Sequence, residues 1–250
     1  MNPKLKKVLI VGSAPDAVRT AAWDTSFFSH VIAINNAWMA CPSWSCLIFP
    51  DDFPKERLPC IDSLQEKQLV TSHEFVPIQN EFGGFVYAGG TMSFTAGYWA
   101  LGALKPDVIA YIGCDMVYDA KLGQMTHFYG CGAADPLRED VTLQSLEAKS
   151  LRLQALAERN GCAVVNLSSQ QTSRLLLPRI DLQTLEAMTQ NSPTTTFNNM
   201  AVQDALRAEA ELGYWVESGR YWEKYEQFES HKLQEIDALW LRTMSESVCS

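Results

Sequence analysis

Basic residues are scarce in this 250-residue chain, which has 20 Lys and Arg against 29 Asp and Glu and a formal net charge of -9. Proteins that bind nucleic acid through its phosphate backbone need clustered Lys and Arg, whose charges release counterions. The acidic balance therefore argues against nucleic acid as the main partner. It says little else beyond solubility.

Long apolar runs are also lacking, since none approaches the roughly 18 to 20 residues that span a bilayer. The amino end, MNPKLKKVLIVGSAPD, is basic, then strand-like, then turn-like, so we expect neither a signal peptide nor a membrane span. The seven cysteines are scattered and include no CxxC pair. This pattern favours free thiols in a reducing, cytoplasmic compartment over a disulfide framework or a zinc site.

Short apolar runs rich in β-branched residues alternate with longer helical segments, which is typical of βαβ units. Strands with helices on both faces carry almost no charge. Five runs meet this description and are predicted strands: residues 8–11, 31–34, 46–49, 108–112 and 163–167. The predicted fold is α/β, with a Rossmann-like, doubly wound, mostly parallel sheet.

Two segments between the predicted strands have helical patterns. Residues 91–104 are apolar nearly all round, which predicts a central helix packed flat against the sheet. Residues 141–160 place leucines among charged side chains, which predicts an amphipathic outer helix.

The composition changes toward the carboxyl end. Residues 191–199 form a polar linker, and residues 200–218 and 219–244 are predicted helices rich in aromatic side chains. We divide the chain into a Rossmann-like nucleotide- or nucleotide-sugar-binding domain, 1–180, and a linker with a C-terminal helical hairpin, 181–250. Aromatic residues at helical spacing predict that the hairpin docks on the core or on another subunit, so a homo-oligomer is left open.

Open parallel sheets bind ligands beyond the carboxyl ends of their strands. After the first predicted strand, Gly12 permits a tight turn, Ser13 can cap a helix, and Pro15 suits a first helical turn. The segment lacks GxGxxG and the P-loop lysine, so a nucleotide half-site and a structural turn are both open. Asn35 either presents its amide to a base or ribose or closes its loop through an Asx turn.

Acidic side chains follow the third predicted strand, where Asp51 and Asp52 form a pair. The pair resembles neither a metal cage nor a glycosidase dyad. We interpret the two residues as solvated loop acids.

Residues 89–129 are the most informative stretch. Gly90 and Thr91 open the apolar helix, and Thr91 or Ser93 lies near its N-terminus. Backbone N–H groups and the helix dipole can hold a phosphate or carboxylate there. Gly113 and Asp115 follow the fourth predicted strand. Cys114, between them, is interpreted as a buried thiol and not as a nucleophile.

The loop that follows carries Tyr118, His127 and Tyr129. His127 is a candidate general acid or base because its ordinary pKa lies close to neutral pH. The alternative is a loop histidine bonded to a backbone carbonyl. Of the other histidines, His73 is expected in a peripheral loop.

Taken in order, five segments resemble the motifs of the bacterial sialyltransferases of glycosyltransferase family 42: VLIVGSAPD, VIAINNAW, GGTMSFTAGYWALGALKPDVIAYIGCDM, THFYG and AERNGCAVVNLSS. They resemble equally a broader group of Rossmann-like proteins, often phage-borne or in surface-polysaccharide clusters, that is similar to archaeal 6-hydroxymethylpterin diphosphokinases. The likeness covers roughly residues 7–177 and consists of motif order and hydrophobic pattern.

The resemblance implies a nucleotide pocket lined by Gly12, Ser13, Asn35, Gly90, Thr91, Gly113 and Asp115, with Tyr129 on the phosphate. The sialyltransferases have Asn where this chain has Ser13. Their catalytic base is the second histidine of a His-Tyr-x-Gly-His loop, where this chain has Cys131 and Gly132. Only His127, displaced by several residues, is available here: either it takes that role in a rearranged loop, or this chain does not transfer sialic acid.

The resemblance further implies a metal-independent, inverting transfer of a sugar from a nucleotide sugar, CMP-linked in that family, to a hydroxyl acceptor such as a glycan. His127 would deprotonate the acceptor, while Tyr118, Tyr129 and the helix end at Thr91 stabilise the departing phosphate. No cofactor is required. Between residues 89 and 129 only Lys105 and Lys121 are basic apart from His127, so we expect a bound phosphate to be held mainly by neutral donors.

Two other functions stay open. The first is pyrophosphate transfer from Mg-ATP, with Asp51, Asp52 and Asp115 as candidate magnesium ligands. The second is a non-catalytic Rossmann-like module that binds a small ligand or a partner protein, with the aromatic hairpin as its contact surface.

Overall fold

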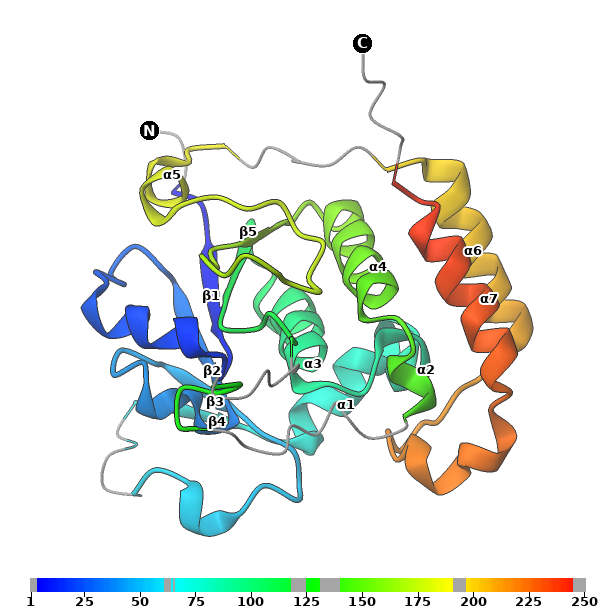
Figure 1. Cartoon of the computed structure of the whole chain (residues 1–250), viewed down its shortest axis with the longest axis horizontal. Helices are drawn as coiled ribbons and strands as arrows, with labels where there is room; N and C mark the ends of the chain where they lie inside the picture. The colour runs from blue at the N-terminus through cyan, green and yellow to red at the C-terminus, as the bar shows by residue number, and fades with distance from the viewer. Residues whose placement is uncertain are drawn as a thin grey trace.

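The computed structural model describes residues 4–60, 64, 66–117, 125–130, 140–190 and 197–244. These residues build a six-stranded parallel sheet at the centre of the molecule (Figure 1). The strands in chain order are β1 (Lys7–Val11), β2 (His30–Ile34), β3 (Cys46–Ile48), β4 (Gln68–Val70), β5 (Val108–Ile112) and β6 (Ala163–Asn166).

The strand order β4-β3-β2-β1-β5-β6 makes the sheet doubly wound. The chain passes outward from β1 to β4 and then returns to the other side of β1 to form β5 and β6. The predicted α/β, Rossmann-like fold is therefore confirmed, and all the pairings between these strands are parallel. The direction of winding reverses between β1 and β5, and doubly wound sheets bind their ligands at such a point.

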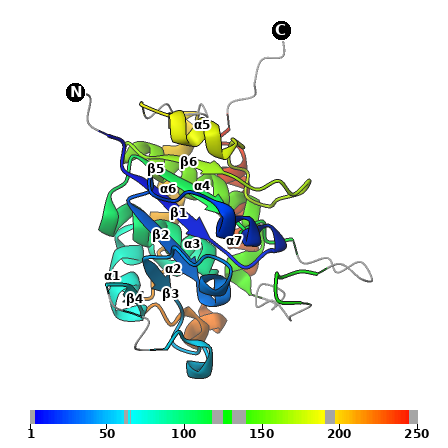
Figure 2. The ribbon, with the colours of Figure 1, turned by 90° about the vertical axis from the view of Figure 1, so that its left-hand side faces the viewer.

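Helices cover both faces of the sheet, which explains why the strands carry so little charge (Figure 2). Alternate strand residues belong to two separate cores: Val8 and Ile10 to one, Leu9 and Val11 to the other. The first core includes α1 (Ser72–Glu81), α2 (Gly84–Ala88), α3 (Met92–Trp99) and α4 (Leu146–Arg159). The second includes the 3-10 helices η1 (Pro15–Ala22) and η2 (Asn35–Met39) and the short helix α5 (Leu182–Ala187).

Several smaller elements complete the domain. The predicted central helix is confirmed as α3, which continues into a π-helical turn, η5 (Ala100–Leu104). Short 3-10 turns lie after β3, at η3 (Lys55–Arg57), and before α4, at η7 (Val141–Leu143). The sheet has one strand more than we predicted, because β4 is a three-residue edge strand that includes an exposed Gln68.

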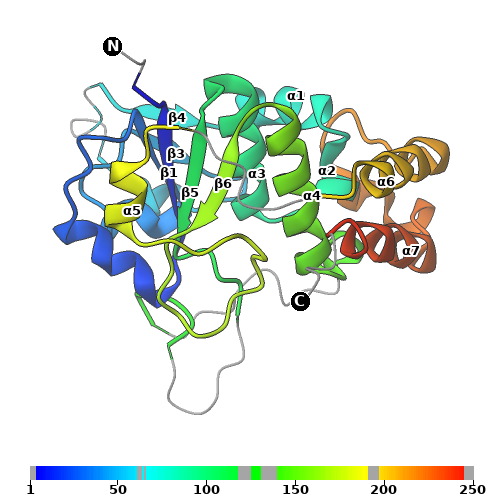
Figure 3. The ribbon, with the colours of Figure 1, turned by 90° about the horizontal axis from the view of Figure 1, so that it is seen from above.

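The C-terminal part docks on the core, where α6 (Asn199–Leu212) and α7 (Ser230–Leu241) lie side by side beyond α4 (Figures 1 and 3). Buried ion pairs hold it there. Arg152 of α4 donates to both carboxylate oxygens of Glu209 at 2.8 Å, and Lys149 pairs with Asp237 at 2.6 Å. Association of two copies through this hairpin stays a prediction.

The boundaries predicted for the hairpin were wrong in two places. The first helix ends at Leu212, not Ser218, because Gly213 adopts a left-handed conformation with φ 66° and closes the helix. The second predicted helix is broken into the 3-10 helix η8 (Tyr221–Gln227) and α7, with Phe228 extended between them. No helix in the described ranges has the length and apolar character needed to cross a membrane.

Candidate functional site

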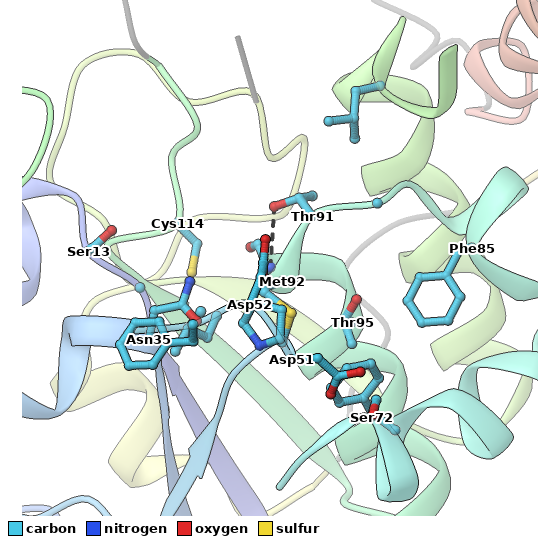
Figure 4. A pocket seen from close by; sticks show the side chains of 18 of the residues that line it. Ser13, Asn35, Asp51, Asp52, Ser72, Phe85, Thr91, Met92, Thr95 and Cys114 are labelled. Atoms are coloured by element: carbon cyan, nitrogen blue, oxygen red, sulfur yellow. Dashed lines mark hydrogen bonds between the residues drawn. The ribbon is translucent and has the colours of Figure 1, made fainter. Parts of the chain in front are cut away.

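A cavity of about 1000 Å³ lies at the carboxyl ends of β1, β2, β3 and β5. Figure 4 shows its lining, with Ser13, Asn35 and Cys114 toward one side and Phe85 and Ser72 toward the other. Further walls come from the turn between α2 and α3, from the segment 126–129, and from residues 218–222 before and within η8. The cavity therefore occupies the switch point, where ligands of doubly wound sheets bind.

Two glycines meet at the floor of the cavity. The N–H of Gly12 donates to Ile112 at 2.8 Å, and the N–H of Ala14 donates to the Gly113 carbonyl at 2.9 Å. A Cβ on Gly12 would overlap that carbonyl oxygen and lie 2.6 Å from Sγ of Cys114. Gly113 also has a left-handed φ of 69°. Both positions need glycine, because a Cβ on either residue would meet backbone atoms of the other.

Ser13 lines the cavity, but it does not cap η1, the role that its position after the first strand suggested. The N-cap of η1 is Ala14, without a side-chain hydrogen bond, and Pro15 begins the first turn. The carbonyl of Ser13 instead accepts a hydrogen bond from the N–H of Phe128 at 3.0 Å. This bond joins the loop after β1 to the loop that carries His127.

Asn35 is strained and only partly satisfied. Its backbone has φ 52°, in the left-handed region, and its side chain lines the cavity. Its Oδ1 atom is buried and accepts no hydrogen bond from any described residue. A buried acceptor without a partner costs about 1–3 kcal/mol, so such an atom in a cavity is a feature of a ligand site.

The first turn of α3 faces the cavity through Thr91, Met92 and Ser93. The sequence predicted Thr91 or Ser93 near this helix end; Thr91 is the N-cap residue, and its hydroxyl accepts the N–H of Ser93 at 3.4 Å. Gly90 also lines the cavity, but its N–H already donates to the Thr142 hydroxyl at 3.0 Å. The helix end rather than Gly90 is thus the part of this turn suited to an anion.

His127 and Tyr129 reach the cavity together. Their rings stack with centroids 5.0 Å apart, and the Thr126 hydroxyl lies 2.9 Å from Nδ1 of His127. Burial lowers the pKa of His127 from its ordinary value, which favours the neutral imidazole. Tyr129 is 46% exposed and presents its phenol to solvent at the mouth of the cavity.

Asp115 does not line the cavity with the other predicted site residues. It is buried behind the strand end, where Oδ2 accepts from the Ser168 hydroxyl at 2.8 Å, and it is not part of the cavity lining. Cys114 lines the cavity instead. Burial raises the pKa of its thiol to about 12, which keeps it protonated and a poor nucleophile. Tyr118, the third candidate on this loop, lies outside the described residues.

The acidic pair after β3 is exposed, as predicted, and it also lines the cavity. Asp51 and Asp52 could therefore contact a ligand. Among the residues that the structure describes, no group of three or more His, Cys, Asp and Glu side chains is arranged to hold a metal ion.

Three basic side chains of the cavity were missed by the sequence analysis. Arg57 of η3 and Arg220 before η8 line it, as does His73. His73 lies in the first turn of α1 and not in a peripheral loop. These residues come from segments far apart in the sequence, and no motif marks them. They add two guanidinium groups to a site expected to depend on neutral donors.

Comparisons of this chain with protein-family models, with curated proteins and with solved structures found no match. The chemistry of the cavity is therefore the basis for assigning a function.

Proposed function

We propose that this chain is a glycosyltransferase, similar to sialyltransferases, that binds a nucleotide sugar in the cavity and transfers the sugar to a hydroxyl acceptor. One observation carries the proposal: a single cavity at the switch point combines bare strand ends, an unsatisfied Asn35 oxygen, a helix N-terminus and a neutral imidazole. Each of these features suits one part of the substrate.

The nucleotide would occupy the side of the cavity formed by the strand ends. Gly12 and Gly113 pack against each other at the ends of β1 and β5, and both line this side of the cavity. Oδ1 of Asn35 can accept a hydrogen bond from a base amino group or a ribose hydroxyl, which satisfies it. CMP is the first candidate nucleotide, because its cytosine carries an amino group and because the sialyltransferases that this sequence resembles use a CMP-linked sugar.

The phosphate would lie at the first turn of α3, where Thr91 and Ser93 line the cavity. Backbone N–H groups and the dipole at this helix end favour a negative charge. The Tyr129 phenol and the guanidinium group of Arg57 can add hydrogen bonds as negative charge develops on the departing phosphate.

His127 would act as the general base. When its Nδ1–H donates to the Thr126 hydroxyl, Nε2 carries the lone pair that takes the proton of the acceptor hydroxyl. The acceptor oxygen then bonds to the anomeric carbon as the bond from that carbon to the nucleotide phosphate breaks. The bonding electrons leave with the phosphate, and the configuration at the anomeric carbon inverts. This route uses side chains and backbone donors and requires no cofactor.

Calorimetric titration with CMP, UMP and ADP, each with EDTA and then with magnesium, tests the proposal. We expect CMP to bind with the same affinity in both conditions. Failure of all three nucleotides to bind at millimolar concentration would overturn the assignment.

Adding ATP to this series of titrations, with EDTA and then with magnesium, tests the second candidate function, which is pyrophosphate transfer. The carboxylates of Asp51 and Asp52 both line the cavity, which favours pyrophosphate transfer because that reaction needs magnesium ligands. Binding of ATP that requires magnesium, with no binding of CMP, would support this function in place of the first. A non-catalytic module would bind a nucleotide equally well after His127→Gln and show no turnover in either form.

A further inference from the structure

The proposed function leaves one side of the cavity without a role. We call it the distal wall and define it by Val76 of α1, Phe85 of α2, and Arg220, Tyr221 and Trp222. In Figure 4, Phe85 lies on the side of the cavity away from Ser13 and Asn35. Small-molecule sites range over roughly 300 to 1000 Å³, so a cavity of about 1000 Å³ has space for a second substrate beside the nucleotide sugar.

Close packing fixes the position of the distal wall. The Cα of Gly219 fits against Val76 and Phe85, because a Cβ there would lie 3.0 Å from atoms of both side chains. The buried ring of Tyr221 stacks on Phe85 with centroids 6.2 Å apart. The Tyr221 hydroxyl donates to Oδ2 of Asp140 at 2.8 Å. The wall is therefore held in place before any ligand binds, which reduces the entropy lost on binding.

Two exposed side chains of the wall can recognise a ligand. Trp222 is 55% exposed, and its ring meets Tyr221 edge to face at 5.4 Å. Arg220 forms an ion pair with Glu223 at 3.6 Å, and both side chains are more than half exposed. Such a surface pair contributes little to stability, so the guanidinium can exchange Glu223 for a carboxylate on a ligand.

We infer that the distal wall binds the acceptor and that the acceptor is an acidic sugar. The apolar C–H face of the sugar ring packs on Trp222, and its carboxylate pairs with Arg220 through parallel hydrogen bonds. The inference rests on the proposed function only in that a hydroxyl of this sugar is the group that His127 deprotonates. Binding of the sugar itself requires no nucleotide.

Saturation-transfer NMR with glucuronate and glucose tests the inference, because these two sugars differ in a carboxylate at one carbon. Trp222→Ala and Arg220→Gln are compared with matched controls on the same C-terminal part. Trp215→Ala removes a tryptophan of similar exposure that does not line this cavity. Arg207→Gln removes an exposed arginine that is ion-paired with Asp204 three residues away, as Arg220 is with Glu223.

We expect the wild-type protein to bind glucuronate more tightly than glucose. Arg220→Gln should weaken glucuronate binding roughly tenfold and remove the preference, because a charge-assisted pair is lost. Trp222→Ala should weaken the binding of both sugars, and the two controls should bind as the wild type does. Absence of glucuronate binding in the wild type, or equal binding in the variants and their controls, would overturn the inference.

Calorimetry with CMP on the same proteins separates this inference from the proposed function. If CMP binds and glucuronate does not, the acceptor site is wrong and the nucleotide site stands. If glucuronate binds through Trp222 and Arg220 and no nucleotide binds, the sugar site stands and the transferase function fails.

Discussion

The hydroxyl of Tyr221 occupies the space in which a side chain on Gly90 would begin. A Cβ on Gly90 would overlap this hydroxyl and lie 2.6 Å from Cζ of the same ring. Gly90 precedes α3, whereas Tyr221 follows α6 more than a hundred residues later in the chain. The C-terminal part thus completes the cavity that the sheet begins, and the lining of the candidate site extends beyond residues 1–180.

Replacing Gly90 by Ala should expel Tyr221 from its hydrogen bond with Asp140. We expect a loss of about 1–3 kcal/mol in the free energy of unfolding, the usual cost of overpacking a well-packed site. Urea unfolding measures it. In a Tyr221→Ala background the same Gly90→Ala change should cost much less, and an equal cost in both backgrounds would contradict the packing described here.

The buried ion pair between Arg152 and Glu209 should dominate the docking of the hairpin. Glu209→Ala leaves the Arg152 guanidinium, which is 1% exposed, without its carboxylate, so we expect a loss of about 3–5 kcal/mol. Asp204→Ala breaks the exposed pair with Arg207 on the same helix and should cost at most about 1 kcal/mol. Urea unfolding of both variants checks this, and similar losses would show that the buried pair is not decisive.

Asn35→Gly should separate stability from function. Glycine adopts a φ of 52° without strain, so we expect the free energy of unfolding to change by less than about 1 kcal/mol. Loss of the Oδ1 acceptor should weaken CMP binding roughly tenfold. Thermal unfolding and calorimetry measure the two effects. The matched change Asn160→Gly, at the end of α4 and outside the cavity, should leave CMP binding unchanged.

The rate of sugar transfer should depend on pH through the protonation of His127. Burial lowers its pKa, so the ring stays neutral until the pH falls below the ordinary value of about 6.5. Because the neutral form is the base, transfer should be lost as the pH falls through this lowered pKa. NMR titration of the ring protons measures the pKa directly. His127→Gln should remove the acid limb from the rate profile, and an acid limb that persists would assign it to another group.

The fold was predictable because its signals are local. The predicted strands are continuous apolar runs. Gly12 and Asn35 directly follow two of these runs, and Thr91 begins the apolar helix. Their place at the edge of the sheet therefore follows from chain order. The edge strand β4, QLV, has three residues and only two apolar side chains in a row, too few to mark a strand. The position of Asp115 at a strand end did not reveal the direction of its side chain, which turns toward Ser168 while Cys114 faces the cavity.

The basic and aromatic half of the site was not predictable in the same way. Arg57, His73 and Arg220 belong to three different elements, and only the folded chain brings them to one cavity. The aromatic residues of the C-terminal part were interpreted as packing. That holds for Tyr221, which is 6% exposed, but not for Trp222, whose exposed ring lines the cavity.

A crystal structure of the protein soaked with CMP tests the central claim most directly. We expect density for the nucleotide between the loops of Gly12 and Gly113, with a donor of the nucleotide within hydrogen-bond distance of Oδ1 of Asn35 and the phosphate at the first turn of α3. Density for CMP elsewhere on the molecule, with this cavity empty at saturating concentration, would contradict the account.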